Sequence, residues 1–146
     1  MKYETKDKGD VGVAKVIADL TEKDIKVALP ISEHLPFDLI AIREDGKLSK
    51  ISVKYRKINN YGCVAVPLRT ISSNAKGYKI KCADLSYVDA FAIYCPETKE
   101  IYYVGSKSLE GHKAEFSMRI DARSGDGPDI RYAKDYTNVD NIWKVY

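Results

Sequence analysis

The sequence predicts an α/β fold with a mixed central β-sheet flanked by helices. An amphipathic pattern near the start of the chain predicts one helix. The middle holds a series of short β-prone segments separated by turn residues, and the end carries a second apolar stripe at helical spacing. No internal repeat or linker divides the 146 residues, a length that suffices for one core. A single domain over residues 1–146 is therefore expected.

The first element is a helix over residues 7–23. Apolar residues from Val13 to Leu20 recur at i, i+3, i+4 and i+7 and form one stripe. Asp10 lies in the first turn, where a carboxylate can cap free amides or interact with the helix dipole. A short strand over residues 26–30 is expected to follow.

Residues 37–57 indicate a β-hairpin that follows a polar loop over residues 31–36. Four consecutive apolar residues, 39–42, are typical of a strand that is covered on both faces. Asp45-Gly46 is a hairpin turn signal. Beyond it the residues alternate, so one face of the second strand carries Lys50, Ser52, Lys54 and Arg56.

The rest of the chain predicts further strands and one more helix. Residues 69–75 and 123–129 are expected to be loops, because turn-forming residues gather there. A terminal helix is expected over residues 132–143. The predicted strands cover residues 61–66, 78–83, 88–94, 101–105 and 116–120.

Composition excludes several classes of protein. With 45% hydrophobic and 31% charged residues, the chain is typical of a globular protein, and no apolar run approaches the roughly 20 residues of a membrane span. The first ten residues lack the apolar segment of a signal peptide, so a cytoplasmic location is expected. Three widely spaced cysteines and two distant histidines give no structural zinc pattern, and the cysteines are expected to be buried and reduced.

The charge of the chain is strongly uneven. Residues 46–83 contain nine Lys and Arg and no Asp or Glu, whereas acids outnumber bases 21 to 15 elsewhere. This polarisation favours a polyanionic partner that docks on the basic segment. The alternative is a set of solvated strand faces.

The predicted hairpin contains the minimal parts of a phosphodiesterase site. Hydrolysis of a phosphodiester needs an activated water and stabilisation of phosphate charge, which Mg²⁺ on a carboxylate and a nearby lysine can supply. A two-residue turn would place Asp38 opposite Val53, whereas a three-residue loop at 45–47 would place it opposite Lys54 on one face. An exposed Asp–Lys pair without function is the alternative.

Longer motifs carry a family resemblance. The chain contains, in order, G-D-V-G-V-A-K-V-I-A-D-L, L-P-I-S-E-H-L-P-F-D-L-I and I-S-V-K-Y-R, followed by Y-V-D-A-F-A-I-Y-C-P-E-T, E-I-Y-Y-V and I-R-Y-A-K-D-Y. This pattern resembles the PD-(D/E)XK nuclease superfamily, and most closely its group I intron-encoded homing endonuclease branch. The resemblance covers residues 9–136 and implies a restriction-endonuclease-like fold.

The resemblance also implies roles for individual residues. Asp38 matches the metal-binding Asp of the motif, Lys54 its catalytic Lys, and Val53 would offer its backbone carbonyl to Mg²⁺. The family acts as a symmetric homo-oligomer on double-stranded DNA, which here implies a dimer or tetramer. Each site would cut one strand and leave a 5′-phosphate and a 3′-hydroxyl.

Two positions depart from the family pattern. Ser52 stands at the (D/E) position, where its hydroxyl would support a metal-bound water. Val13 stands where the first helix usually carries a Glu. Asp10 and Glu33 are the candidates for the missing ligand, with helix capping and a solvated loop as the respective alternatives.

Three functions are compatible with these features. The first is a metal-dependent, site-specific double-strand DNA endonuclease; the others are a junction- or end-processing nuclease of the same fold and a catalytically silent DNA-binding module. Phosphate contacts are expected from the basic segment, with Arg69 or Asn74 reading bases. The candidate DNA-binding residues are Lys50, Arg56, Lys57, Arg69, Asn74, Lys76, Lys79 and Lys81.

Overall fold

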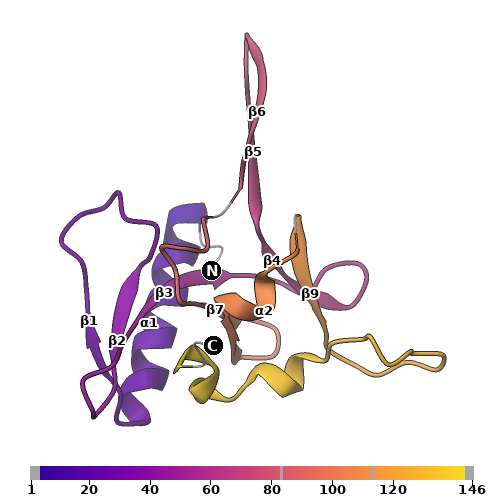
Figure 1. Ribbon diagram of the computed structural model, residues 1–146. Helices are drawn as coiled ribbons and strands as arrows, with labels where there is room; N and C mark the ends of the chain where they lie inside the picture. The colour runs from indigo at the N-terminus through magenta and orange to yellow at the C-terminus, as the bar shows by residue number, and fades with distance from the viewer. Residues whose placement is uncertain (1–3, 83, 113, 144–146) are drawn as a thin grey trace.

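The computed structural model describes residues 4–82, 84–112 and 114–143. Its centre is a five-stranded sheet in the order β1-β2-β3-β7-β8 (Figure 1). β3 and β7 are parallel and the other pairs are antiparallel, so the sheet is mixed, as predicted. The strands are β1 (Lys26–Ala28), β2 (Leu39–Ile42), β3 (Leu48–Tyr55), β7 (Ala90–Cys95) and β8 (Glu100–Gly105).

Helix α1 (Thr5–Glu22) covers one face of this sheet. Its buried Val16 and Leu20 pack with Leu39 of β2 and Ile51 of β3, which excludes water from that face. The helix packs closely on β3 at Gly12, where a Cβ atom would lie 3.4 Å from a methyl group of Val53. A larger side chain at this position would push α1 away from the strand that carries Lys54.

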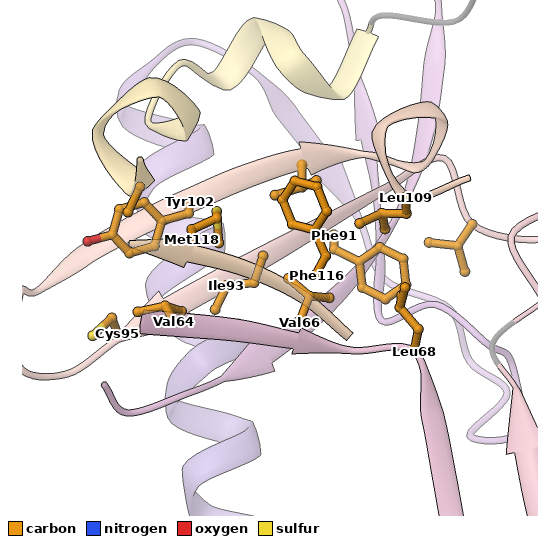
Figure 2. Packing of buried hydrophobic residues seen from close by; sticks show 13 residues of the cluster. Val64, Val66, Leu68, Phe91, Ile93, Cys95, Tyr102, Leu109, Phe116 and Met118 are labelled. Atoms are coloured by element: carbon orange, nitrogen blue, oxygen red, sulfur yellow. The ribbon is translucent and has the colours of Figure 1, made fainter. Parts of the chain in front are cut away.

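The opposite face carries a second hydrophobic core. A two-stranded sheet of β4 (Cys63–Pro67) and β9 (Glu115–Arg119) packs over β7 and β8. Val64 and Val66 of β4 and Phe116 of β9 lie against Phe91 and Ile93 of β7 (Figure 2). The one-turn helix α2 (Ser106–Leu109) closes the end of this core with Leu109.

A separate β-hairpin projects from the two packed sheets (Figure 1). It consists of β5 (Arg69–Asn74) and β6 (Gly77–Cys82), which form six antiparallel residue pairs, from Arg69–Cys82 to Asn74–Gly77. The prediction of a loop over residues 69–75 is therefore wrong. β5 is polar, and its backbone becomes a strand because β6 supplies the ladder of hydrogen bonds.

The C-terminal segment also differs from the prediction. Instead of one helix over 132–143, it forms two short 3₁₀ segments, η1 (Ala133–Tyr136) and η2 (Val139–Trp143). Between them the Asn138 side chain accepts a hydrogen bond from the Asp140 amide, a local contact that competes with a continuous helix. The apolar stripe is still used, because Ile142 and Trp143 are buried against the α1 face of the sheet.

Two expectations from composition can be compared with the described residues. All three cysteines are free, but only Cys95 is buried; Cys63 is half-buried, and Cys82 is exposed because it lies on the projecting hairpin. No helix in the described part of the chain combines the length and the apolarity that crossing a membrane requires.

Candidate active site

The turn between β2 and β3 sets the register of the candidate site. Arg43 and Lys47 close a three-residue loop, with hydrogen bonds of 2.8 Å from the Arg43 amide to the Lys47 carbonyl and from the Gly46 amide to the Arg43 carbonyl. Gly46 has φ +90°, a left-handed conformation that glycine adopts without strain. The Asp45 carboxylate accepts the Lys47 amide and pairs with the Arg43 guanidinium, which together lower the pKa of Asp45.

This register differs from both predicted ones. Leu39 pairs with Ile51 and Ile42 with Leu48, and Asp38 directly precedes the last of these pairs, so continuing the register puts it level with Ser52 rather than Val53 or Lys54. The error arises because the loop holds residues 44–46 rather than 45–47. The predicted loop 45–47 and the observed loop 44–46 shift the partner of each β2 residue by two positions along β3. Side chains alternate between the two faces with a period of two, so this shift does not change the face. Asp38 therefore stays on the face of Lys54, diagonal to it instead of directly across.

Asp38 is fixed at the end of the β2–β3 ladder. Its amide donates to the Ile51 carbonyl at 2.8 Å, and its carboxylate Oδ2 accepts the Val53 amide at 2.7 Å. The carboxylate thus replaces the backbone partner that Val53 would have in a longer strand. The last ladder pair is Leu39–Ile51, so Val53 lies two residues beyond the end of the ladder. The contact with its amide orients the Asp38 carboxylate at this end of the strand pair.

Ser52 is a buried hydroxyl with an unusual environment. Its side chain is only 5% exposed, between Asp38 on one side and Phe91 on the other. The hydroxyls of the other two buried serines, Ser49 and Ser106, donate to the carbonyls of Ile142 and Val88. Within the described ranges no such partner is present for the Ser52 hydroxyl. Among the described residues, the fully enclosed side-chain atoms without a partner are Arg119 Nε and Arg131 Nε, so the Ser52 hydroxyl keeps access to solvent and can hydrogen-bond a water or ligand.

Lys54 is half-buried beside this serine, and its parallel partner is the core residue Ile93. Burial lowers the pKa of Lys54, the charge of Arg56 lowers it further, and the charge of Asp38 opposes both. The influence of Asp38 on this pKa reflects their proximity on one face. The lysine is therefore held in a partly desolvated position at the margin of the β4–β9 core.

The donor set of the site fits a magnesium ion that keeps several waters. Mg²⁺ in proteins usually binds one or two carboxylates and fills its octahedron with water and substrate phosphate. Asp38 and the Val53 carbonyl are ligands of this type, and the Ser52 hydroxyl can hydrogen-bond one of the waters. In residues 4–82, 84–112 and 114–143, no group of three or more His, Cys, Asp or Glu side chains could hold a metal. Asp38 is the carboxylate that the β2–β3 strand pair itself brings to the site.

The remaining sequence-predicted ligands come from segments outside the β2–β3 strand pair. Asp10 is exposed on α1, the helix that packs on the face of β3 opposite to Ser52 and Lys54. Glu33 is exposed in the loop before Asp38. Val13 is half-buried on α1 and offers no ligand atom. The structure does not bring Asp10 and Glu33 together with Asp38 into a three-acid cluster.

The residues predicted to bind DNA form two groups. The first contains Lys50, which lies within β3, and Arg56 and Lys57, which directly follow the strand. Arg69, Asn74, Lys76, Lys79 and Lys81 belong to the β5–β6 hairpin. Asn74 accepts the Lys76 amide, so its carbonyl oxygen shapes the turn of the hairpin.

The sequence analysis missed a supporting residue. The carboxylate of Asp89 accepts the Lys50 amide at 2.8 Å, and its own amide donates to the Lys50 carbonyl at 2.9 Å. This two-way contact locks the start of β7 onto β3, two residues before Ser52. The acid directly before the apolar run of residues 90–95 was its sequence signal.

The geometry agrees with a family comparison. A family model described as PD-(D/E)XK endonuclease matches residues 3–139. The chain belongs to this family. Nucleases of this family hydrolyse phosphodiester bonds, and this is the class of activity that membership assigns to the chain. No curated protein matches the sequence.

Two solved structures share the PD-(D/E)XK fold with the chain. One is the bacterial homing endonuclease I-Ssp6803I, with a TM-score of 0.78 and 20% identity over 92% of this chain and 88% of that chain. The other is Hjc, a Holliday junction resolvase from the archaeal hyperthermophile Archaeoglobus fulgidus. It has a TM-score of 0.50 and 13% identity over 77% and 84% of the respective chains. At these identities the likeness establishes the restriction-endonuclease-like fold.

Proposed function

We propose that the chain is a Mg²⁺-dependent, site-specific double-strand DNA endonuclease. The observation that carries the proposal is the position of Asp38, Ser52 and Lys54 on one sheet face, with an oriented carboxylate, a hydroxyl without a protein partner in the described residues, and a half-buried lysine. The likeness to a homing endonuclease over most of the chain supports the choice of DNA as substrate.

Each residue has a defined role in this proposal. Asp38 and the Val53 carbonyl would hold Mg²⁺, with Asp10 and Glu33 as candidates for a further ligand; when bound, the ion supplies an activated water and stabilises phosphate charge. The Ser52 hydroxyl holds a water by hydrogen bonding. Lys54 places its ammonium at the phosphate, where partial burial strengthens the electrostatic interaction.

The substrate and the oligomeric state follow from the same proposal. One site cuts one strand, so a double-strand break needs two sites related by symmetry, which a dimer or tetramer of this chain would provide. The basic residues along β3 would bind the backbone next to the cut. The projecting β5–β6 hairpin has the dimensions of a two-stranded ribbon, which the major groove of B-DNA admits.

Cleavage of supercoiled plasmid and phage DNA tests the proposal. Purified protein is expected to nick and then linearise DNA that contains its target in Mg²⁺ or Mn²⁺, and to be inactive in EDTA. A four-way junction of arbitrary sequence serves as the competing substrate. Preferential cutting of the junction would favour the resolvase alternative, and duplex binding without any cleavage in either metal would contradict an enzymatic function.

The hairpin can be tested separately by the salt dependence of binding. Changing both Lys76 and Lys79 to Gln is expected to reduce the slope of log Kd against log salt by about two, because each phosphate contact contributes about 0.9. The measurement is fluorescence anisotropy with labelled duplex in Ca²⁺. Lys134→Gln, on η1 of the C-terminal segment, is the control and should leave the slope unchanged. An unchanged slope in the double variant would remove the hairpin from the DNA interface.

A further inference from the structure

The face that carries Ser52 and Lys54 continues beyond the end of β3. The Arg56 amide donates to the Tyr94 carbonyl at 2.9 Å, so the backbone still follows β7 one residue after Tyr55. Since side chains alternate along a strand, Arg56 occupies the next position on the same face as Lys54. It is half-buried, whereas the following Lys57 is exposed. The chain thus places a second cation next to the lysine of the site.

The guanidinium of Arg56 has no acid to balance its charge. Its Nη1 donates to the Tyr55 carbonyl at 2.9 Å, which holds the group along its own strand. Within the described part of the chain, no carboxylate forms an ion pair with it, and the nearby Glu97 accepts the Ile58 amide instead. Burial lowers the pKa of Arg56, but arginine stays protonated in proteins. Four N–H donors of the fork remain for another partner.

Two neighbouring cations in a partly desolvated position repel each other, and this arrangement is unfavourable without a counter-charge. Asp38 supplies one negative charge to this face, and Ser52 supplies none where the family pattern has a second acid. Asp38, Lys54 and Arg56 therefore leave a net charge of about +1. A phosphodiester is the anion that this face would accept, and the planar fork of arginine matches two phosphate oxygens.

We propose that Arg56 is a second phosphate-binding residue of the active site, which holds the scissile phosphodiester together with Lys54. The inference rests on the proposed nuclease function and adds a residue that the two-residue (D/E)XK motif does not contain. With Arg56 in this role, the substrate phosphate is positioned by two side chains of β3 and the segment that directly follows it.

The test compares Arg56→Gln and Arg56→Lys with the wild type, with Lys26→Gln on the edge strand β1 as the control. Rates are measured at saturating target-containing DNA in a single turnover, and Kd for the same duplex is measured against salt in Ca²⁺. Arg56→Gln is expected to cleave about 10²-fold more slowly and to lose about one from the salt slope. Arg56→Lys is expected to keep the slope and to recover about tenfold in rate. The control should match the wild type in both measurements.

Each outcome bears on one of the two proposals. A wild-type rate in Arg56→Gln at saturating DNA, or a lysine variant no faster than the glutamine variant, would overturn the role of Arg56 while the nuclease function stands. If the wild type cleaves nothing, the nuclease function fails, and the salt slope alone decides whether Arg56 contacts a phosphate. Circular dichroism and Tm verify that each variant is folded, and the lysine variant preserves the charge if glutamine is not tolerated.

Discussion

Lys54→Ala is expected to lower the single-turnover rate of DNA cleavage by at least about 10³-fold and to change Kd for the duplex only a few-fold. The ammonium is half-buried beside Ser52, where water cannot replace it as it would at the surface. Removing one preorganised charge from such a site costs about 10²–10³ in rate, and Lys54 serves the reacting phosphate directly. Binding is spread over many other cations, so it depends little on this one.

Asp38→Asn provides the complementary variant of the same prediction. The amide oxygen of the new side chain can still accept the Val53 amide, so the β2–β3 ladder should end as in the wild type. The negative charge is lost, and cleavage in Mg²⁺ should fall as far as in Lys54→Ala. Lys26→Ala on the same sheet is the control and should cut normally. Normal cleavage by either site variant, at saturating DNA, would place the reaction elsewhere in the molecule.

The second large effect is expected from Ser52→Asp, which restores the acid of the family pattern. Without metal, the new carboxylate is desolvated and lies near Asp38, and this cost is expected to exceed its attraction to Lys54, so the free energy of unfolding should fall by about 1–3 kcal/mol. Burial would raise the pKa of this carboxyl above its unfolded value. The loss should therefore be absent at low pH and should grow as pH rises through the unfolded pKa of about 4.

Magnesium should reverse this loss. If the restored acid tightens binding so that the ion is present at 100 times its Kd, the folded state gains about 2.7 kcal/mol. A thermal melt across Mg²⁺ concentrations measures the effect, and the wild type should show a smaller shift of Tm. Ser49→Asp is the matched control, because Ser49 is as buried on the same strand but points to the opposite face. A Tm of Ser52→Asp that does not respond to Mg²⁺ would exclude a metal at this position.

Local patterns in the sequence were enough to predict most of the central sheet. The alternation of residues 48–57 and the apolar run of β7 specify strands, because burial on one or both faces leaves few alternatives. Of the two turns that the sequence allowed, only the three-residue loop placed Asp38 and Lys54 on one face. Sequence analysis failed where partners distant in sequence or polar side chains decide the backbone. β5 is a strand because β6 pairs with it, and the C-terminal stripe is not a continuous helix because Asn138 interrupts it.

The exact pairing of the site was also beyond local patterns. Asp45-Gly46 identifies a turn, but the residues that close it depend on where the left-handed Gly46 falls in the loop, and here its amide donates to the Arg43 carbonyl. The free hydroxyl of Ser52 and the two-way contact of Asp89 with Lys50 are likewise properties of packing. They depend on which strand lies beside β3, and the order of the strands cannot be predicted from the sequence of a single segment.

The three-residue β2–β3 loop constrains how this protein can change during evolution. If one residue is inserted in this loop and β2 shifts by one position along β3, every side chain of β2 moves to the other face. Asp38 would then point toward α1 and be separated from Lys54. An insertion of two residues would keep both on the same face and shift their spacing by one step. Length variants of this turn among descendants of the chain should therefore be biased toward even differences, provided that selection maintains cleavage.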